Sequence, residues 1–258
     1  MLSASGVTVD LGGRPILRDL GFEAAPGRLT AIVGPNGSGK TTLLRVLTGE
    51  IRGAGRVTLD GEEIARLAHW RLALRRAVLP QAARLAFPFT LREVVAMGLA
   101  AGASAGRHRV IDEALDAVDL AARGGARFAT LSGGEQARGH LARALAQVWE
   151  PVADGKPAWL LLDEPVASLD IGHQLLVMRC VAAYARRGGG VVAVMHDLNL
   201  TAMFADRVVL LDGGGVAAAG TAAEVLTDAL LGGAYRAPLR VNRAPPDGGV
   251  FVLPQAAL

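Results

Sequence analysis

The chain has 258 residues, of which 51% are hydrophobic and 20% are charged, and its formal net charge is +3. This length fits one large domain that can bury a sizeable core, and the small net charge gives no support to a nucleic-acid groove. No apolar run approaches the ~18 residues of a membrane-spanning helix, the N-terminus lacks a signal-peptide pattern, and Cys180 has no second cysteine to pair with. We therefore expect a soluble, cytoplasmic α/β protein.

A glycine-rich loop is the first strong motif along the chain. Residues 34–41 read Gly-Pro-Asn-Gly-Ser-Gly-Lys-Thr and match G-x-x-x-x-G-K-[ST], in which the Thr binds Mg²⁺. Only two of the 27 basic residues are lysines, and Lys40 is one of them; a compact ammonium group can reach phosphates through such a loop, whereas a guanidinium is a poor substitute. The alternative is an accidental match in a chain with 33 glycines. The residues that we predict to contact a nucleotide here are Gly34, Pro35, Asn36, Gly37, Ser38, Gly39, Lys40, Thr41 and Thr42.

The context of this loop favours a phosphate site. The apolar run Leu29–Val33 before it has strand character, and a helical pattern opens at Thr41. Strand, glycine loop and helix is the order that aims a helix N-terminus at an anion. Val57–Gly61 and Ala77–Pro80 then read as further strands of the first segment.

The pattern becomes helical from Arg84 to about Gln147. Thr90 and Glu93 are spaced as a capping box that opens one helix, and Arg109–Val118 is a second helical run. This stretch reads as a helical insert in an α/β core.

Residues 131–136, Leu-Ser-Gly-Gly-Glu-Gln, contain a second capping box formed by Ser132 and Glu135. We expect a helix from here through Gln147. Gly133 and Gly134 leave backbone N–H groups open to an anion, which makes a second potential phosphate site. A symmetric dimer, with each nucleotide between the first loop of one copy and this helix start of the other, explains both sites. An ordinary capped helix is the alternative.

A pair of carboxylates follows the apolar run Trp159–Asp163. Asp163 would end a buried strand at the sheet edge where α/β proteins bind ligands. There Asp163 can hold Mg²⁺ through water, and Glu164 is placed to polarise an attacking water. An acidic turn after a core strand is the alternative. A helix over His173–Arg187 and a strand over Val191–Met195 follow, which indicates a mainly parallel sheet buried on both faces.

Residues 34–41, 131–136 and 160–164 together resemble the Walker A, signature and Walker B motifs of ABC transporter ATPases. The resemblance covers about residues 1–230. It implies an α/β fold: a P-loop NTPase core with a mixed, mainly parallel sheet, plus a helical subdomain. The implied organisation is a single ABC ATPase domain over 1–258, with a RecA-like core and N-terminal β region over 1–83 and 148–235, a helical subdomain over 84–147, and an irregular tail over 236–258.

The resemblance also implies roles for single residues. Gln81 resembles the Q-loop glutamine, which contacts Mg²⁺ and water and links to the membrane partner, and Asp170 resembles the D-loop aspartate at the dimer seam. His196 resembles the switch histidine that touches the γ-phosphate; taken alone it would be an ordinary loop histidine. The implied catalytic set is Glu164, His196, Gln81 and Lys40; the metal set is Thr41, Gln81 and Asp163; and ATP is also bound by Leu11, Ser132, Gly133, Gly134, Glu135 and Asp170.

Residues 85–90, 93–98 and 196–200 look like those of importers of iron–siderophore, heme and cobalamin, and the segment Trp149–Trp159 resembles the hemin-importing ATPases in particular. This implies ATP and Mg²⁺ as cofactors, and as partners a second copy of the chain, a permease dimer and, indirectly, a periplasmic heme-binding protein, without nucleic acid. The ATPase would lie at the cytoplasmic face of the inner membrane.

Other functions stay open at this point. A siderophore or cobalamin importer fits the same motifs. A soluble ABC ATPase acting on ribosomes or DNA typically has two cassettes or long coiled-coil insertions, which this chain lacks, and a non-catalytic nucleotide sensor is disfavoured by Lys40, Asp163 and Glu164. Two residues depart from the family pattern: Val166 replaces a Thr, and Leu11 replaces an aromatic residue that stacks on adenine.

Overall fold

The computed structural model describes residues 1–81 and 87–257. The first residues of the predicted helical insert, 84–86, and two residues of the importer-like pattern, Leu85 and Ala86, lie outside the described residues. The strands are β1 (Leu2–Leu11), β2 (Arg14–Ala24), β3 (Leu29–Val33), β4 (Ala54–Leu59), β5 (Glu62–Glu63), β6 (Arg76–Leu79), β7 (Val152–Ala153), β8 (Lys156–Pro157), β9 (Trp159–Asp163), β10 (Gly190–Val194), β11 (Arg207–Asp212) and β12 (Gly215–Gly220).

The helices alternate with these strands along the chain. The α-helices are α1 (Lys40–Leu47), α2 (His69–Arg75), α3 (Leu91–Ala101), α4 (Arg109–Ala117), α5 (Gly133–Gln147), α6 (Ile171–Arg186), α7 (Leu198–Phe204), α8 (Ala222–Val225) and α9 (Asp228–Tyr235). Short 3₁₀ helices are η1 (Ile64–Arg66), η2 (Ala121–Arg123), η3 (Phe128–Thr130) and η4 (Pro254–Ala257).

A six-stranded sheet in the order β12-β11-β3-β10-β9-β6 forms the centre of the molecule. Its strands run parallel except for β12, which pairs antiparallel with β11. The sheet is therefore mixed and mainly parallel, which confirms the fold class predicted from the sequence. Every residue of β3, β9 and β10 is buried, because other elements cover both faces of the sheet.

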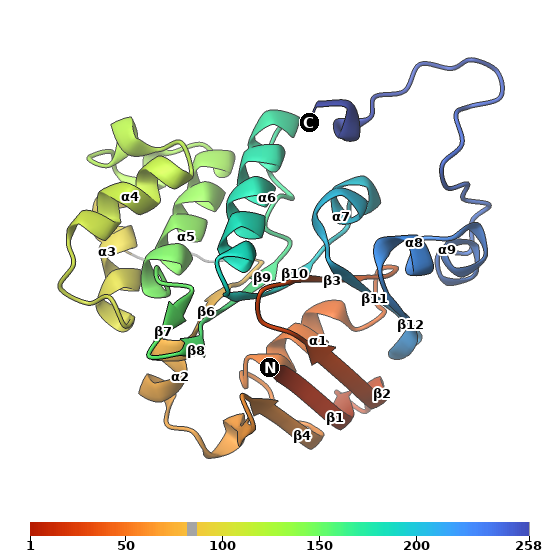
Figure 1. Cartoon of the computed structure of the whole chain (residues 1–258), viewed down its shortest axis with the longest axis horizontal. Coiled ribbons are helices and arrows are strands. Elements are labelled where there is room, and N and C mark those ends of the chain that lie inside the picture. Colours follow the sequence, from red (N-terminus) through yellow and green to blue (C-terminus); the bar gives the residue numbers. More distant parts are fainter. Residues whose placement is uncertain (82–86, 258) are drawn as a thin grey trace.

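The two faces of this sheet carry separate hydrophobic clusters. On one face, α1 and the antiparallel sheet β2-β1-β4-β5 enclose the first cluster. On the other face, α5, α6 and α7 lie over the sheet (Figure 1) and contribute to the second cluster together with α3 and α4. The loop between β3 and α1 thus connects the central sheet to the layer that contains α1.

The helices α3, α4 and α5 form the helical part of the molecule beside the sheet (Figure 1). Both predicted capping boxes are present, at Thr90 with Glu93 and at Ser132 with Glu135. Gly98 allows α3 to approach α5 closely: a Cβ there would lie 2.0 Å from the carbonyl oxygen of Arg143, and a larger residue would push the two helices apart.

The segment from Trp149 to Trp159 contains a small hairpin. Strands β7 and β8 pair antiparallel around Asp154 and Gly155, which both have positive φ angles of 50° and 71°. Two such residues in a row suit a two-residue hairpin turn. Trp159 at its end is fully buried in the sheet.

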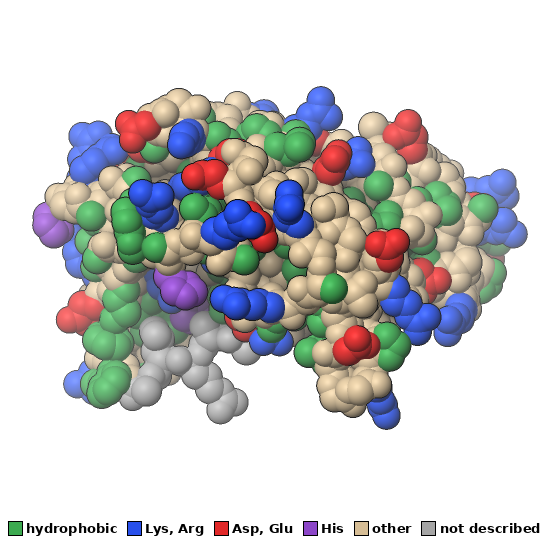
Figure 2. Space-filling model, turned by 90° about the horizontal axis from the view of Figure 1, so that it is seen from below, with side chains coloured by type: hydrophobic (Ala, Val, Ile, Leu, Met, Phe, Trp, Pro, Cys, Tyr) green, Lys and Arg blue, Asp and Glu red, His purple; other side chains and the backbone are tan. Residues whose placement is uncertain are grey.

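Residues 237–253 are irregular, and Gln255, in η4, donates a hydrogen bond to the Asn199 side chain at 3.3 Å. Within the described ranges, no helix combines the length and the apolar character that crossing a bilayer requires. On the face seen in Figure 2, basic and acidic side chains are interspersed.

Candidate active site

The glycine loop between β3 and α1 is shaped by backbone angles that other residues avoid. Gly34 has a φ angle of 149°, and a Cβ there would lie 2.2 Å from the carbonyl oxygen of Leu211. Gly39 has a φ angle of 98°, and its Cβ would lie 2.6 Å from Leu17 Cδ2. The loop can follow this path only with glycine at these two positions.

Lys40 is the first residue of α1 and is buried, with 6% of its surface exposed. Its Nζ donates to the carbonyl oxygens of Gly34 at 2.8 Å and Pro35 at 2.9 Å. Burial lowers the pKa of Lys40, while the charges of Glu164 and Asp163 act in the opposite direction. The ammonium group is thus already inside the loop, where an anionic ligand could take over its hydrogen bonds.

Ser38, in the same loop, gives an independent sign of a ligand. Its side chain is buried, and its Oγ has no hydrogen-bond partner in the structure. A buried polar group without a partner is costly. An anionic oxygen accepting from this hydroxyl and from Lys40 would satisfy both, so the loop fits a phosphate group.

A hydroxyl and a carboxylate meet beside the loop. Thr41 Oγ1 donates to Asp163 Oδ1 at 3.2 Å, which joins the start of α1 to the end of β9. Burial raises the pKa of Asp163, the charge of Glu164 adds to this effect, and the hydrogen bond from Thr41 opposes it. Together with Gln81, these two residues line a hollow of about 170 Å³.

This oxygen-rich set fits Mg²⁺, which is held by one or two carboxylates together with substrate phosphates and water rather than by a protein cage. Across residues 1–81 and 87–257, no group of three His, Cys, Asp or Glu side chains is placed to hold a metal ion unaided. Thr41, Asp163 and Gln81 are the residues that could hold Mg²⁺ next to a bound phosphate.

Glu164 and His196 form a close pair at the neighbouring strand ends. Because Asp163 of β9 pairs with Val194 of β10, the residues that follow the two strands face each other. Glu164 Oε1 lies 2.6 Å from His196 Nε2, and Glu164 has a φ angle of 52°, held by a 3.2 Å hydrogen bond from its N–H to Val194 O. Positive φ in a non-glycine residue marks a strained position that is typical of functional sites.

The loop and the acid–histidine pair surround one cavity of about 260 Å³. The structure therefore brings together residues from three predicted motifs that are far apart in the sequence. The residues that line it are Ile16, Asn36, Gly37, Gly39, Lys40, Thr41, Thr42, Glu164 and His196.

Comparison with known proteins identifies the family. The family model described as ABC transporter matches residues 17–167, which is more than half of the chain. The chain belongs to the ABC transporter family. Hemin import ATP-binding proteins HmuV from Jannaschia sp. (strain CCS1) and Roseobacter denitrificans are 56% and 57% identical to it; these matches cover 100% and 99% of this chain and 95% and 98% of the relatives.

Solved structures agree with this assignment. A bacterial ABC transporter cassette solved as a dimer superimposes with a TM-score of 0.74 at 27% identity, covering 86% of this chain and 99% of that chain. The same cassette, in a post-hydrolysis state bound to ADP and Pi, also has a TM-score of 0.74, at 26% identity, over 86% of this chain and 99% of that one. As an ABC transporter ATPase, this chain binds and hydrolyses ATP.

The ABC signature segment occupies a different place from the cavity. The Ser132 side chain accepts from the Glu135 N–H, and Glu135 Oε2 accepts from the Ser132 N–H at 2.8 Å, which lowers the pKa of Glu135. Within the described part of the chain, the residues that line the cavity do not include Ser132, Gly133, Gly134, Glu135 or Asp170. These predicted ATP contacts are therefore not assembled with the glycine loop of the same copy.

Leu11 lies at the end of β1, pairs with Arg14 across the turn, and is 44% exposed. It does not belong to the residues that line the cavity, whereas Ile16, from β2, does. Sequence reasoning missed Ile16, because an aliphatic residue in a strand carries no signal of ligand contact.

Val166, the other departure from the ABC pattern, is explained by packing. Its side chain is 7% exposed and belongs to the cluster beneath the helices. A valine in this place buries a methyl group where a threonine would bury a hydroxyl, so the substitution suits an apolar site.

Proposed function

We propose that this chain is the ATP-hydrolysing subunit of an importer for hemin. The observation that supports this most strongly is the full-length similarity to hemin import ATP-binding proteins, at 56% and 57% identity. The position of Lys40 in the glycine loop and the contact between Glu164 and His196 support this proposal, because phosphate binding and orientation of a water molecule need such groups.

The geometry supports a mechanism of positioning and charge stabilisation, as phosphoryl transfer requires. Lys40 and the loop N–H groups bind the β- and γ-phosphates, and Ser38 supplies a further donor. Mg²⁺, when held by Thr41, Asp163 and Gln81, would neutralise charge on the phosphate oxygens. Glu164 accepts a hydrogen bond from the attacking water and thereby orients it, while His196 holds the Glu164 carboxylate and reaches the γ-phosphate.

We further propose that two copies enclose each nucleotide. In this arrangement Ser132, Gly133, Gly134 and Glu135 of one copy face the cavity of the other, and Asp170 lies at the seam. Two features support it: the signature residues are absent from the cavity that their own copy forms, and the similar cassette was solved as a dimer. Backbone N–H groups at the start of α5 offer the second set of phosphate donors.

A permease is the proposed membrane partner. Beside Arg76 and Val78 of β6, the chain has a hollow of about 290 Å³. Gln147 at the end of α5 donates to the carbonyl oxygens of Ala73 at 2.9 Å and Arg76 at 3.0 Å, so helices α2 and α5 are joined beside it. A permease segment docked here at the cytoplasmic face of the inner membrane would contact both the core and the helical part. The residues that line this hollow are His69, Ala73, Arg76, Val78, Met97, Gly98, Ala101, Arg143 and Gln147.

The cargo is tested in a reconstituted importer. The chain, its permease and the periplasmic binding protein are assembled in liposomes, and ATP hydrolysis is measured with binding protein loaded with heme, an iron–siderophore or cobalamin. Heme-loaded protein should stimulate hydrolysis most. Preferential stimulation by a siderophore or cobalamin would overturn hemin as the cargo while leaving the ATPase assignment in place.

A further inference from the structure

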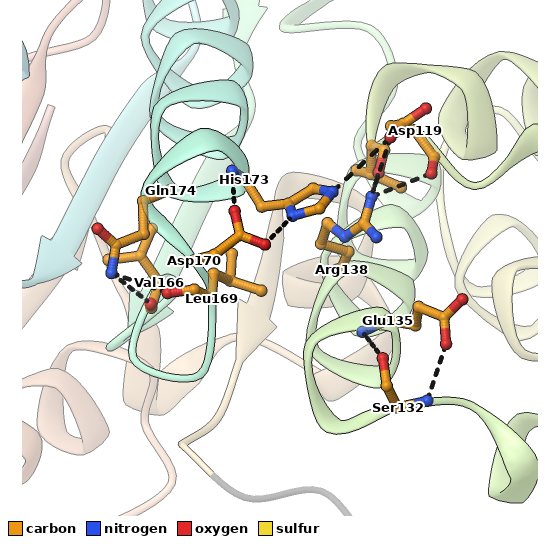
Figure 3. Close-up of polar contacts among 10 residues, drawn as sticks. Asp119, Ser132, Glu135, Arg138, Val166, Leu169, Asp170, His173 and Gln174 are labelled. Atoms are coloured by element: carbon orange, nitrogen blue, oxygen red, sulfur yellow. Dashed lines mark hydrogen bonds and ion pairs between the residues drawn. The ribbon is translucent and has the colours of Figure 1, made fainter.

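A polar bridge joins the sheet core to the helical part of the molecule (Figure 3). Nδ1 of His173, in the first turn of α6, lies 2.7 Å from Oδ2 of Asp170, which caps that helix. Nε2 of the same ring lies 3.7 Å from Oδ2 of Asp119, which follows α4. One imidazole ring thus contacts a carboxylate on each side of the boundary.

Asp119 is held in place by α5. It has a φ angle of 57°. The Arg138 guanidinium, which belongs to a residue only 6% exposed, donates to the carbonyl oxygens of Val118 at 2.8 Å and Asp119 at 3.0 Å. The same Nη1 lies 3.6 Å from Asp119 Oδ2. Arg138 lies in the helix that Ser132 opens, so the position of Asp119 follows the position of the signature helix.

The other end of the bridge is the turn formed by residues 166–170. Asp170 Oδ1 accepts from the His173 N–H at 2.9 Å, and Gln174 Nε2 donates to Leu169 O at 3.1 Å. The turn also touches the start of α5, because a Cβ on Gly134 would lie 3.4 Å from Leu169 Cδ2. The predicted seam turn and the signature helix are therefore neighbours, and the His173 bridge spans them.

We propose that His173 is a positioning residue for ATP hydrolysis, which bridges Asp170 to Asp119 and so fixes the seam turn relative to Ser132. This rests on the proposed function, in which the turn and Ser132 meet a second copy. His173 contacts no substrate and acts through Asp170. If the bridge is lost, ATP still binds to the glycine loop, but the two copies form fewer productive dimers.

Three variants test the bridge: H173N, D119N and the double variant. The backbone N–H of residue 173 remains in H173N, so the Asp170 cap of α6 persists. Asparagine tolerates the left-handed conformation at position 119. The matched control is D112N, which makes the same chemical change in the helical part but breaks the Arg92–Asp112 pair, which does not cross the boundary.

We expect H173N and D119N each to lower kcat about three- to fivefold, because exposed ion pairs contribute only modestly. The double variant should have about the same kcat as either single variant, because mutations of two residues that contact each other are not additive. The Kd for ATP of the isolated chain and the KM should stay unchanged, and D112N should match the wild type.

The wild type distinguishes failure of the inference from failure of the proposed function. A wild type whose hydrolysis does not rise cooperatively with protein concentration contradicts the two-copy arrangement. If hydrolysis by the wild type does rise cooperatively with protein concentration but H173N has the same kcat as the wild type, the proposed role of His173 is wrong. Additive losses in the double variant, or a weaker Kd for ATP that accounts for the loss of activity, also overturn it.

Discussion

The Glu164 carboxylate lies 2.6 Å from Nε2 of His196, across the ends of two paired strands. Glu164 is 15% exposed and His196 is 45% exposed, so the carboxylate is sheltered while the ring reaches the cavity. The pair adjoins Lys40 and Thr41, which belong to the phosphate loop. A carboxylate held in this way needs no reorganisation before it orients a water molecule.

Replacement of Glu164 by glutamine tests its role in catalysis. E164Q keeps the size and the left-handed backbone but removes the negative charge that polarises water. We expect turnover to fall at least about a hundredfold, in the range of general-base effects, while ATP binding persists and ATP-bound dimers accumulate. Hydrolysis by phosphate release and dimers by sedimentation measure the two quantities; turnover near that of the wild type in a clean preparation would reject the role.

Asp163 links the active site to stability. Burial raises the pKa of this carboxyl in the folded protein above its unfolded value. When the folded pKa of a carboxyl is raised, its ionised form lowers the free energy of unfolding at pH values above the folded pKa, where the group is ionised in both the folded and the unfolded state. At pH values below the unfolded pKa the group is protonated in both states, and it has no such effect. D163N should therefore raise Tm at pH 7 in the absence of nucleotide and abolish turnover.

The pH series supplies the control for this variant. The gain in Tm should shrink as pH falls through the folded pKa of Asp163 and vanish below the unfolded value. For a chain of this length, each 1 kcal/mol corresponds to about 2–4 °C. Scanning calorimetry of both proteins between pH 4 and pH 8 measures it, and a Tm gain independent of pH would show that desolvation of the charge is not its cause.

Much of the fold could be predicted from the sequence, because its signals are local. The runs Leu29–Val33, Trp159–Asp163 and Val191–Met195 are apolar except for Thr30 and Asp163, and they correspond to β3, β9 and β10 within one residue. Both capping boxes are likewise short patterns with one physical meaning. The glycine loop is also a local signal, because its backbone angles require glycine at fixed positions. The sequence pattern of the loop therefore indicates a phosphate site by itself.

The features that were missed depend on contacts between distant segments. The hairpin of β7 and β8 has strands of two residues, too short for any periodicity to appear. The sequence places Glu164 and His196 each after a strand, but their contact depends on β9 lying next to β10. The bridge between Asp119 and His173 joins two segments whose pairing no local pattern reveals.

The two-site arrangement is tested at Ser132. S132R places a long cationic side chain at the start of α5, where the proposed partner's nucleotide would lie. Because Lys40 belongs to a separate cavity, we expect the isolated chain to bind ATP with unchanged Kd. ATP-dependent dimers in an E164Q background and hydrolysis in the wild-type background should both be lost.

A matched control exists in the same molecule. Thr221 forms a capping box with Glu224 at the start of α8, of the same type as that of Ser132. T221R removes a similar cap without placing a charge at the signature helix and should therefore dimerise normally. Sedimentation of both variants with ATP compares them; an S132R variant that dimerises as well as T221R would contradict the shared site.

The last prediction concerns the base of the nucleotide. Leu11 lies at the end of β1 and is 44% exposed, and the resemblance to ABC ATPases predicts that an aromatic residue would stack on adenine at this position. Ile16 is an apolar residue that lines the cavity. In the proposed function, the loop, Lys40 and Mg²⁺ would contact the triphosphate, and these contacts would not depend on the identity of the base. An aromatic face would add about 0.5–1.5 kcal/mol beyond simple burial, and an aliphatic side chain lacks this contribution.

We therefore expect ATP and GTP to be hydrolysed within about tenfold of each other, since 1.4 kcal/mol corresponds to one decade. L11Y should tighten ATP binding modestly and leave kcat nearly unchanged, because the base is remote from the reacting phosphate. I16Y, which places the same ring at the cavity wall, is the positional control. Titrations of all three proteins with ATP and GTP decide between the two positions. If only I16Y binds ATP more tightly, the base contacts Ile16 and not Leu11. If the wild type strongly prefers ATP and L11Y leaves this preference unaltered, another residue recognises adenine.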